Sequence, residues 1–476
     1  MQDRAADAIA ELTRTLPTGR LLTDPDVLAS YRHDRAPDLP AGTPAAVVRA
    51  RTTGEVQTVM RTAHRHRVPV VPRGAGAGLH GGSNAIDGGI VLSVEHMTSV
   101  LDVDPVDRLC TVEPGIMNLA LKQQLAVDGL WYPPDPASMA FCSIGGNVAT
   151  NAGGLCCVKY GVTRDWVAGL EVVMADGTLV TTGAKTIKSV AGYDLTSLFV
   201  GSEGTLGVVT RAILRVRPLP PPASTLVAFF DSLADAGTAV AAICAGEPPA
   251  LCEIMDRSTI GAVNDFQRMD LDTDAAALLL IQSDLAGPAR SEHVTAIEAA
   301  CNANGASYIA RTDDPDEGEA LLQARRMALP AVEQRGVALL EDVGVPRSRV
   351  PALIEATERI AAERGIEIYS YGHAGDGNMH PTLCWAADDA DEHARSMLAF
   401  DDILTAALEL GGTTTGEHGV GLLKDGWLER EVGPASLAVQ RQIKQALDPE
   451  GILNPGKMAL GARAPFAAAG DRTAAV

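Results

Sequence analysis

Histidine and acidic side chains suited to metal or acid–base chemistry gather in two short segments of the C-terminal half. The segments are Tyr371-Gly-His373-Ala-Gly-Asp376-Gly-Asn378-Met-His380 and Gly416-Glu417-His418-Gly419. Two imidazoles and a carboxylate with an open position form a catalytic site for Zn²⁺, and imidazole also suits Fe, Mn or Co. The alternative is that these histidines only hydrogen-bond a loop, and spacing by itself does not decide between the two.

The spacing of His373 and His380 limits the element that carries them. Seven residues would be two helical turns, but the flanking and intervening glycines and Pro381 make a helix improbable. We therefore expect the two imidazoles to converge through a loop or through a strand–turn arrangement.

Glycine is unevenly distributed, which indicates that backbone approaches something closely in a few places. The 47 glycines concentrate at residues 74–89, 145–154, 201–207 and 372–377. Gly76-x-Gly78-x-x-Gly81 has the spacing of a dinucleotide fingerprint. A Rossmann unit needs a helix to open at these glycines, whereas HGGSNAIDGG has turn composition and leads into a strand, so we reject that assignment. A glycine loop between strands can still hold a pyrophosphate through backbone N–H groups, with Arg73 as a nearby cation. The alternative for this loop alone is a glycine-rich hairpin that binds no ligand.

Strands and helices that position these segments are mixed in the first 220 residues. Strands at 45–50 and 68–71, with a helix capped by Thr53 between them, form a βαβ unit. A further strand at 90–95 and a short helix around 117–127 follow. Asp176-Gly177 then joins two alternating strands as a hairpin.

The run PLPPPA at 218–223 marks a boundary, because consecutive prolines extend neither a helix nor a strand ladder. Beyond it the order is strand, helix, strand, strand, helix, strand, over residues 225–230, 232–245, 251–255, 277–282, about 289–303 and 307–311. This βαββαβ order is that of a ferredoxin-like layer, so we expect a cap domain and an α+β fold.

Composition excludes several classes of protein. The 476 residues carry a formal charge of −21, which argues against duplex DNA or an anionic membrane as the main partner. No apolar run in the sequence is long enough to span a membrane, and the N-terminus is polar, unlike a signal peptide. We therefore expect a cytoplasmic protein. None of the eight cysteines forms a CxxC pair, which argues against an iron–sulfur cluster in this chain.

The glycine-rich segments PRGAGAG, PPDPASMAFCSIGGNVATNAGG, KYG and GSEGTLGVV resemble, in order and spacing, the PCMH-type FAD-binding domain of the vanillyl-alcohol oxidase/p-cresol methylhydroxylase superfamily. The resemblance covers about residues 40–220 and implies FAD as the cofactor. The residues implied to bind FAD are Pro72, Arg73, Gly74, Ala75, Gly76, Ala77, Gly78, Leu79, Pro134, Asp135, Ser138, Ser143, Gly145, Gly146, Asn147, Ala152, Gly153, Tyr160, Glu203, Gly204, Gly207, Val208, Val209 and Asn454.

His80 stands where related sequences usually carry a small residue. Some superfamily members attach FAD covalently through histidine, but we expect His80 to be an ordinary loop histidine.

The C-terminal half resembles the D-lactate dehydrogenase/glycolate oxidase flavoprotein family, whose members are D-2-hydroxyacid dehydrogenases. LLQARRMALPA, EDVGVP, GHAGDGNMHP, GGTTTGEHGVG and DPEGILNPGK occur in the family's order. The resemblance implies that His373, His380 and Glu417 are metal ligands, that His418 is the catalytic base, and that Arg325 pairs with the substrate carboxylate. Arg326 is adjacent to Arg325 and is the alternative partner.

Linker and resemblance together divide the chain into five parts. We expect an N-terminal helical segment at 1–42, the FAD-binding domain at 43–220 and a cap or substrate domain at 221–410. A segment at 411–460 is expected to return to the FAD domain, and residues 461–476 to form a flexible tail.

Four polar residues near the histidines are expected to have supporting roles. Asp376 and Asn378 suit a loop turn better than metal ligation. For Glu341 and Asp342, before Val-Gly-Val-Pro, a solvated strand end is as plausible as a functional contact.

The resemblance implies hydride transfer from a 2-hydroxy acid to flavin N5, with the metal ion lowering the hydroxyl pKa. Leu340 and Thr382 occupy positions where 2-hydroxyglutarate enzymes typically carry Lys and Asn, so a monocarboxylate such as D-lactate or glycolate is favoured over a dicarboxylate. D-2-hydroxyglutarate, or a substrate that is not a hydroxy acid, remains the alternative. The electron acceptor is external: a quinone, an electron-transfer flavoprotein, an iron–sulfur partner subunit or O₂. A homodimer and peripheral contact with the inner membrane face are compatible with the sequence.

Overall fold

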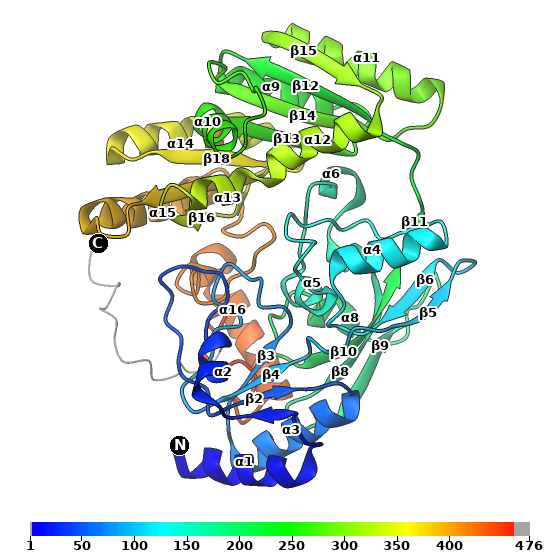
Figure 1. Cartoon of the computed structure of the whole chain (residues 1–476), viewed down its shortest axis with the longest axis vertical. Helices are drawn as coiled ribbons and strands as arrows, with labels where there is room; N and C mark the ends of the chain where they lie inside the picture. Colours follow the sequence, from blue (N-terminus) through cyan, green and yellow to red (C-terminus); the bar gives the residue numbers. More distant parts are fainter. Residues whose placement is uncertain (1, 461–476) are drawn as a thin grey trace.

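The computed structural model describes residues 2–460, so the tail expected at 461–476 lies outside the described residues. Figure 1 shows two units, one above the other. The lower unit contains the elements from α1 to β11 and the C-terminal helix α16. The upper unit contains the elements from β12 to α15.

The first sheet of the lower unit confirms the expected βαβ unit. Strands β2 (Ala46–Arg49) and β3 (Val70–Arg73) both pair in parallel with β4 (Ile90–Ser93), and α3 (Thr53–His66) connects β2 to β3. The expected cap at Thr53 is wrong: Thr52 is extended, and its hydroxyl accepts the N–H of Glu55 at 3.2 Å. The remaining elements at this end are α1 (Gln2–Thr15), β1 (Leu21–Leu22) and α2 (Pro25–Ser30).

A second, antiparallel sheet completes the lower unit. Its order is β5 (Val100–Asp104), β6 (Leu109–Val112), β10 (Val208–Arg215), β8 (Val167–Val173) and β9 (Leu179–Gly183). The expected hairpin at Asp176-Gly177 joins β8 to β9, with the Gly177 N–H donating to the Met174 carbonyl. The connecting elements are α4 (Asn118–Val127), β7 (Leu130–Trp131), α5 (Ile144–Thr150), α6 (Cys157–Tyr160), α7 (Thr163–Trp166), α8 (Leu195–Phe199) and β11 (Arg217–Pro218).

The upper unit has the predicted ferredoxin-like order. Strands β12 (Ser224–Phe230), β13 (Leu251–Asp256), β14 (Ala277–Ser283) and β15 (Ala306–Thr312) lie in the sheet order β15-β12-β14-β13. Helices α9 (Leu233–Cys244) and α11 (Pro288–Ala303) are the two expected helices. The sequence pattern did not indicate α10 (Arg257–Phe266), which lies between β13 and β14.

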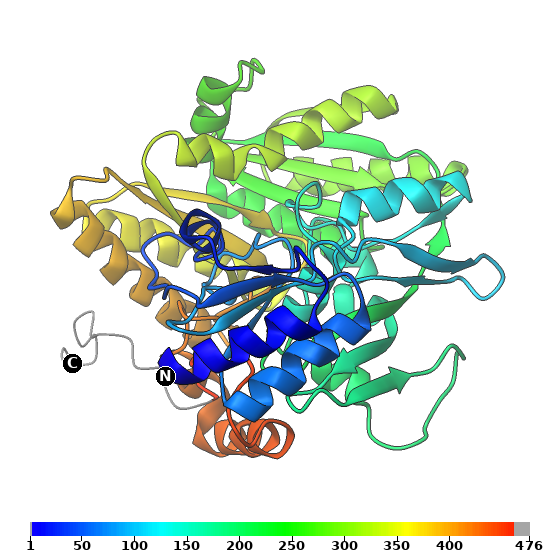
Figure 2. The same cartoon turned by 60° about the horizontal axis from the view of Figure 1, so that its bottom comes forward.

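The same sheet continues beyond β13, and this extension carries the histidines. Strand β18 (Ile368–His373) pairs with β13, β19 (Asn378–Trp385) pairs with β18, and β16 (Val337–Leu340) and β17 (Val343–Gly344) pair with β19. Helices cover both faces of the sheet (Figures 1 and 2). They include α12 (Pro315–Arg326), α13 (Ala328–Glu333), the 3₁₀ turn Arg347–Arg349, α14 (Val350–Arg364) and α15 (Ala390–Glu409).

The chain returns to the lower unit after α15. Helix α16 (Leu428–Leu447) is kinked at Gly433, and Leu453 forms a parallel bridge with Val70 of β3. The buried Lys444 ammonium donates to the carbonyls of Thr205 and Leu453. The C-terminal segment is therefore packed against the strand that leads into the first glycine loop.

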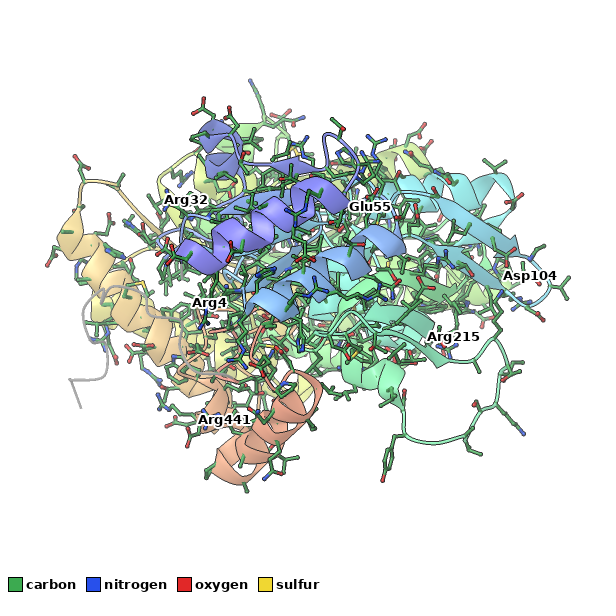
Figure 3. All side chains as sticks on the ribbon, turned by 90° about the horizontal axis from the view of Figure 1, so that it is seen from below. Arg4, Arg32, Glu55, Asp104, Arg215 and Arg441 are labelled. Atoms are coloured by element: carbon green, nitrogen blue, oxygen red, sulfur yellow. The ribbon has the colours of Figure 1, made fainter. Side chains whose placement is uncertain are left out.

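Charged side chains lie over the outside of the molecule. Seen from below, Arg4, Asp104 and Arg441 project from separate elements in Figure 3. Among the described helices, none is both long and apolar enough to cross a membrane.

Candidate active site

A cavity of about 600 Å³ lies between the two units, and it collects most of the predicted site. The expected flavin contacts that line it are Pro72, Arg73, Gly74, Ala75, Gly76, Ala77, Gly78, Leu79, Ser138, Ser143, Gly145, Gly146, Asn147, Ala152, Glu203, Gly204, Gly207, Val208 and Val209. The upper unit and the returning segment add Arg325, His373, His380, Glu417 and His418. Residues from six separate stretches of sequence thus surround one space.

The first glycine loop follows β3 and lies against the start of α5. A Cβ atom on Gly74 would lie 2.4 Å from Ser143 Oγ, and Gly76 has a φ of +70°. The Ala75 N–H donates to the same hydroxyl at 3.3 Å. Glycine loops of this kind let backbone come close to a ligand, and Gly74, Ala75 and Gly76 line the cavity.

Arg73 is the cation that the sequence placed beside this loop. The guanidinium is buried, and it donates to the His33 carbonyl at 3.0 Å and to Ser83 Oγ at 3.3 Å. Burial lowers the pKa of Arg73, while the nearby Asp34 carboxylate opposes that shift. Arg73 therefore brings positive charge to the cavity wall in a fixed position.

Five of the expected flavin contacts do not line this cavity, and four of them make hydrogen bonds to other loops. Asp135 accepts the Cys156 N–H at 2.9 Å, and the Tyr160 hydroxyl bonds Asp284 of the upper unit. The Asn454 amide donates to the carbonyls of Gly82 and Glu203 at 2.9 and 2.8 Å.

Pro134 and Gly153 complete that group. The Pro134 carbonyl accepts from the Asn118 amide at 3.2 Å. Gly153 lies beside Glu417 and lines a second cavity of about 490 Å³. That second cavity also touches His373, so the imidazole and carboxylate groups stand between the two cavities.

His373 and His380 converge through strand–turn geometry, as the glycines predicted. The two residues lie on adjacent antiparallel strands, His373 at the end of β18 and His380 early in β19. The Nε2 atoms of His373 and His380 lie 3.1 and 3.2 Å from Glu417 Oε1. One carboxylate oxygen thus faces an imidazole nitrogen from each strand.

The carboxylates and imidazoles of this cluster shift one another's pKa values. Burial opposes ionisation of Glu417, but the histidines, His373 foremost, hold its pKa well below the usual range. Burial likewise opposes a charged His373, but Glu253 and Glu417 raise the pKa of that imidazole well above its ordinary value. An ionised Glu417 carboxylate therefore lies between the two imidazoles, with Glu253 on the outer side of His373.

Glu253, on β13, is a participant that sequence reasoning missed. Its buried carboxylate lies 2.8 Å from His373 Nδ1 and 2.8 Å from Arg325 Nε. With Nδ1 held by Glu253, the other ring nitrogen, Nε2, is directed toward Glu417. In metal-binding histidines the nitrogen that does not bind the metal is typically held by a carboxylate in this way. The available signal was one acid inside the apolar strand LCEIM.

Arg325 lies at the end of α12, with a side chain 4% exposed. Its guanidinium lies 4.9 Å from the centre of the Tyr371 ring. Arg326 also lines the cavity but pairs with Glu319 on the surface at 2.5 Å. The buried position of Arg325 makes it the better placed of the two for a carboxylate inside the cavity.

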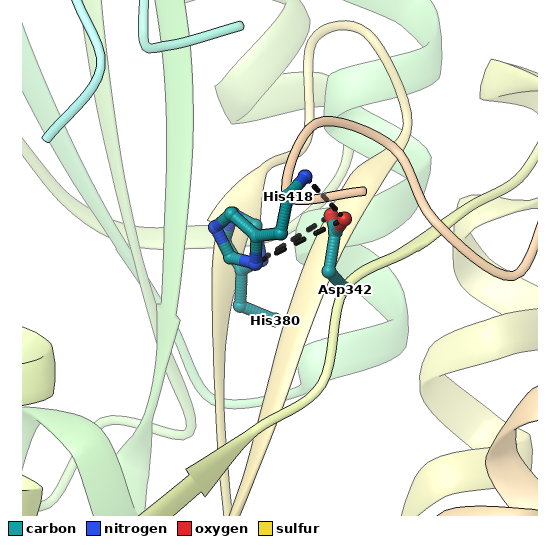
Figure 4. A group of neighbouring side chains, drawn as sticks. All are labelled: Asp342, His380 and His418. Carbon is teal, nitrogen blue, oxygen red and sulfur yellow. Dashed lines mark hydrogen bonds and ion pairs between the residues drawn. The ribbon is translucent and has the colours of Figure 1, made fainter. Parts of the chain in front are cut away.

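His418 lies beside His380 and over Asp342 (Figure 4). The His380 and His418 rings are stacked with centres 5.1 Å apart. Asp342 Oδ2 accepts the backbone N–H groups of Glu417 and His418 at 3.0 and 2.9 Å and the Thr415 hydroxyl at 2.8 Å.

Asp342 also accepts from the Asn378 amide at 2.7 Å. Burial opposes its ionisation, but His418 and Lys424 hold the pKa of Asp342 well below its usual range. Because four donors already occupy its oxygens, Asp342 suits a positioning role. His373, His380 and Glu417 therefore form the better candidate metal site of the two carboxylate–histidine groups that include His380.

Glu341 and Asp342 are fully buried. This excludes the solvated strand end, one of the two alternatives that the sequence left open for these residues. The buried Lys424 ammonium pairs with Glu341 and donates to the Asp342 carbonyl at 2.8 Å. Asp376 instead makes the expected turn by accepting the Asn378 N–H at 3.0 Å.

Comparison with protein families accounts for both units. A family model described as an FAD binding domain matches residues 44–183, and one described as FAD linked oxidases, C-terminal domain, matches residues 219–458. The glycolate oxidase subunit GlcD of Bacillus subtilis (strain 168) is 43% identical over 430 residues, covering 90% of this chain and 91% of that protein. The chain belongs to the FAD-linked oxidase family.

Other FAD-linked oxidases and solved structures agree with this. The probable mitochondrial D-lactate dehydrogenase of Danio rerio is 37% identical over 422 residues, covering 87% of this chain and 84% of that protein. The structure of p-cresol methylhydroxylase with substrate bound matches with a TM-score of 0.83 at 18% identity, covering 97% of this chain and 98% of that chain. This confirms the PCMH-type fold, and the chain is a flavoprotein. The cavity of about 600 Å³ that the glycine loop lines, with the Arg73 cation on its wall, suits the pyrophosphate and ring system of FAD.

Proposed function

We propose that this flavoprotein oxidises a D-2-hydroxy acid, D-lactate or glycolate, to the 2-oxo acid with the help of a divalent metal ion, and passes the electrons to an external acceptor. Relatives named glycolate oxidase subunit and D-lactate dehydrogenase support hydroxy acids as the substrate class. The observation that carries the proposal is the cluster of His373, His380, Glu417 and His418 on the wall of the flavin cavity. FAD, when bound, supplies the hydride acceptor.

His418 is assigned to remove the hydroxyl proton. Asp342 Oδ2 accepts the His418 backbone N–H at 2.9 Å and lies 3.9 Å from Nδ1 of the ring, so Asp342 holds the backbone of the base and places a negative charge near its imidazole. A positioned histidine is the commonest general base in enzymes. His418 lies next to the proposed ligands, where a bound hydroxyl would come within its reach.

His373, His380 and Glu417 are assigned to hold the metal ion, Zn²⁺ first and Mn²⁺ or Fe²⁺ as alternatives. Two imidazoles and one carboxylate leave positions open for substrate oxygens. A divalent ion there would act as a Lewis acid on the substrate hydroxyl and carboxylate. Glu253 supports this assignment because it fixes the outer nitrogen of His373.

Arg325 is assigned to pair with the substrate carboxylate. Its guanidinium is held between the Glu253 carboxylate and the face of Tyr371, so its own charge is already partly balanced. A planar guanidinium in a buried, fixed place gives directional hydrogen bonds to a carboxylate.

The wall near the reacting centre favours a substrate with a small apolar end. Leu329, Pro330 and Leu340 line the cavity there, and Leu340 offers no charge to a second carboxylate. Thr382 is fully buried and bonds the Tyr371 hydroxyl at 3.0 Å, so it does not contact the cavity. Arg326, also on the wall, is the group that supports D-2-hydroxyglutarate as the alternative substrate.

An anaerobic titration tests the proposal. FAD-loaded enzyme is mixed with D-lactate, L-lactate, glycolate or D-2-hydroxyglutarate, and the visible absorbance of the flavin is followed with and without a chelator. We expect bleaching by D-lactate or glycolate that the chelator suppresses. Absence of bleaching by every hydroxy acid contradicts the substrate class, and bleaching that ignores the chelator contradicts the metal role.

A further inference from the structure

His80 lies on the glycine loop after β3, and its ring nitrogens, Nδ1 and Nε2, make no hydrogen bond to the described residues. The residue is 2% exposed and lines the cavity. Buried polar atoms are nearly always paired, so two unpaired nitrogens on one ring point to a partner that binds in the cavity.

The backbone of His80 is fixed independently of its ring. The His80 carbonyl accepts the N–H groups of Leu422 and Leu423 at 2.7 and 3.3 Å. A Cβ atom on Gly421 would lie 2.0 Å from that carbonyl, so the two backbones are in close contact. The side chain could therefore be apolar without loss of any hydrogen bond that the described residues make.

The ring stands at one end of a row of four imidazoles. The ring centres of His80 and His418 are 5.4 Å apart, those of His418 and His380 5.1 Å, and those of His380 and His373 5.1 Å. His373, at the far end, is in contact with Glu253, which in turn pairs with Arg325. His80 is therefore at the end of the row away from the groups assigned to substrate and metal.

His80 is also the member of the row that belongs to the FAD-binding domain. It directly follows Gly78 and Leu79, which line the same cavity. Burial, and then the nearby Lys424 and His418, lower the pKa of His80 well below its ordinary value, with Asp342 opposing and His380 adding to the shift. The ring is accordingly neutral, with one N–H donor and one acceptor nitrogen.

We propose that the His80 imidazole is a hydrogen-bond donor to the polar edge of the bound isoalloxazine ring. The flavin gains electron density on reduction, so a donor at that edge binds the reduced ring more strongly than the oxidised ring. His80 then raises the midpoint potential of the flavin. This inference uses FAD binding only and does not depend on a hydroxy-acid substrate or on a metal ion.

Redox titration of the FAD-loaded enzyme without substrate tests the inference. His80→Leu should shift the oxidised-to-reduced equilibrium about tenfold toward oxidised flavin, which is a potential lower by about 30 mV for a two-electron couple. His80→Gln keeps a donor of similar reach and should recover at least half of that shift. His64→Leu is the matched control, since His64 also has an unpaired buried Nδ1 but does not line the cavity, and its potential should equal the wild-type value.

Each result decides the matter. If His80→Leu keeps the wild-type potential, the ring does not contact the flavin and the inference is overturned. Equal shifts in His80→Leu and His80→Gln, or loss of FAD from both, assign His80 to packing of the loop and also overturn it. Loss of FAD from His80→Leu alone, with FAD retained by His80→Gln, supports a hydrogen bond between the side chain and the flavin.

Discussion

The two walls of the active-site cavity are built in opposite ways. The lower wall is built largely from backbone and small side chains of glycine-rich stretches, as at Gly74 and Gly76, with a few charged side chains such as Arg73 and Glu203. The opposite wall carries the polar and charged side chains Arg325, His373 and Glu417 beside apolar ones such as Leu329 and Leu340.

The two walls should therefore respond to different kinds of substitution. In the flavin wall, backbone groups and glycines are closely packed, and the backbone N–H groups are the same whichever side chains are present. Substitutions there should act mainly by adding volume. The other wall depends on balanced charges in a buried place, where loss of one partner leaves another uncompensated. Substitutions should therefore separate flavin binding from metal binding and from chemistry.

The largest effect is expected for His380→Ala. Removal of one imidazole leaves His373 and Glu417 as the proposed ligands, so bound metal should fall below one equivalent by elemental analysis. Loss of several kcal/mol of Lewis-acid assistance corresponds to flavin reduction slower by about 10⁴-fold. The flavin spectrum should remain that of bound FAD. Full metal content in His380→Ala would remove His380 from the ligand set.

His418→Ala should have the next largest effect, on chemistry alone. Loss of a general base slows proton removal, and flavin reduction by substrate should fall by about 10³-fold. FAD and metal content should stay at wild-type levels, because Glu417 and the two other histidines are intact. His96→Ala, at an exposed histidine, is the control. Reduction of His418→Ala at the normal rate would show that another group removes the proton.

Gly74→Ala tests the flavin wall by adding one methyl group. The new Cβ would lie 2.4 Å from Ser143 Oγ, so the loop must shift and FAD affinity should fall by about tenfold, which is about 1.4 kcal/mol. Metal content should not change. Gly54→Ala, where the nearest atom is 3.9 Å away, should bind FAD normally.

A second substitution sharpens the test. Ser143→Ala removes the hydroxyl that the new methyl meets, and the next Ser143 atom, Cβ, is 3.7 Å away. The double variant Gly74→Ala/Ser143→Ala should therefore bind FAD more tightly than Gly74→Ala alone. Fluorescence titration of apoprotein with FAD measures both. Simple additivity of the two losses would mean that steric contact is not the cause.

The same contrast explains what the sequence predicted. The glycine segments and the histidine pair were recognisable because each lies within one short stretch, and the order of apolar runs was enough for the ferredoxin-like layer. Glu253 was missed because it acts on His373 from 120 residues away. Asp135 and Tyr160 belong to motifs whose other members line the cavity, but their own side chains contact Cys156 and Asp284, and sequence order does not separate the two kinds of residue.

A common signal marks the buried charges near the site, some of which the sequence pattern missed and some of which it left open. Glu253 lies within LCEIM, Glu341 and Asp342 within VALLEDVGV, and Lys424 within GVGLLKDGW, so each charge interrupts an apolar run. A charge that is buried by its neighbours needs a partner. The partners come from other segments, Glu341 with Lys424 among them, and sequence order alone does not name them.

The smallest effect is expected for Glu203→Gln, where the flavin wall contacts the returning segment at Val420 and Gly421. Its carboxylate accepts the N–H groups of Val420 and Gly421 at 2.7 and 2.9 Å, yet burial raises the pKa of Glu203 to about 7. Between pH 4.5 and 7 the folded protein then binds one more proton than the unfolded chain, so stability falls as pH rises, by up to about 1.4 kcal/mol per pH unit. Burial also raises the pKa of Glu341 to about 7, so only part of the slope belongs to Glu203.

Glu203→Gln should accordingly flatten the decline in melting temperature between pH 5 and 7 without abolishing it. Exposed Glu409→Gln is the control and should keep the wild-type slope. Because an amide replaces one acceptor oxygen beside two backbone donors, the variant should also be less stable than wild type at pH 8, where the carboxylate is ionised. An unchanged slope would mean that Glu203 is already ionised at pH 5, its two N–H contacts outweighing burial. Glu203 would then be a buried but ionised carboxylate, as Glu417 is among the histidines.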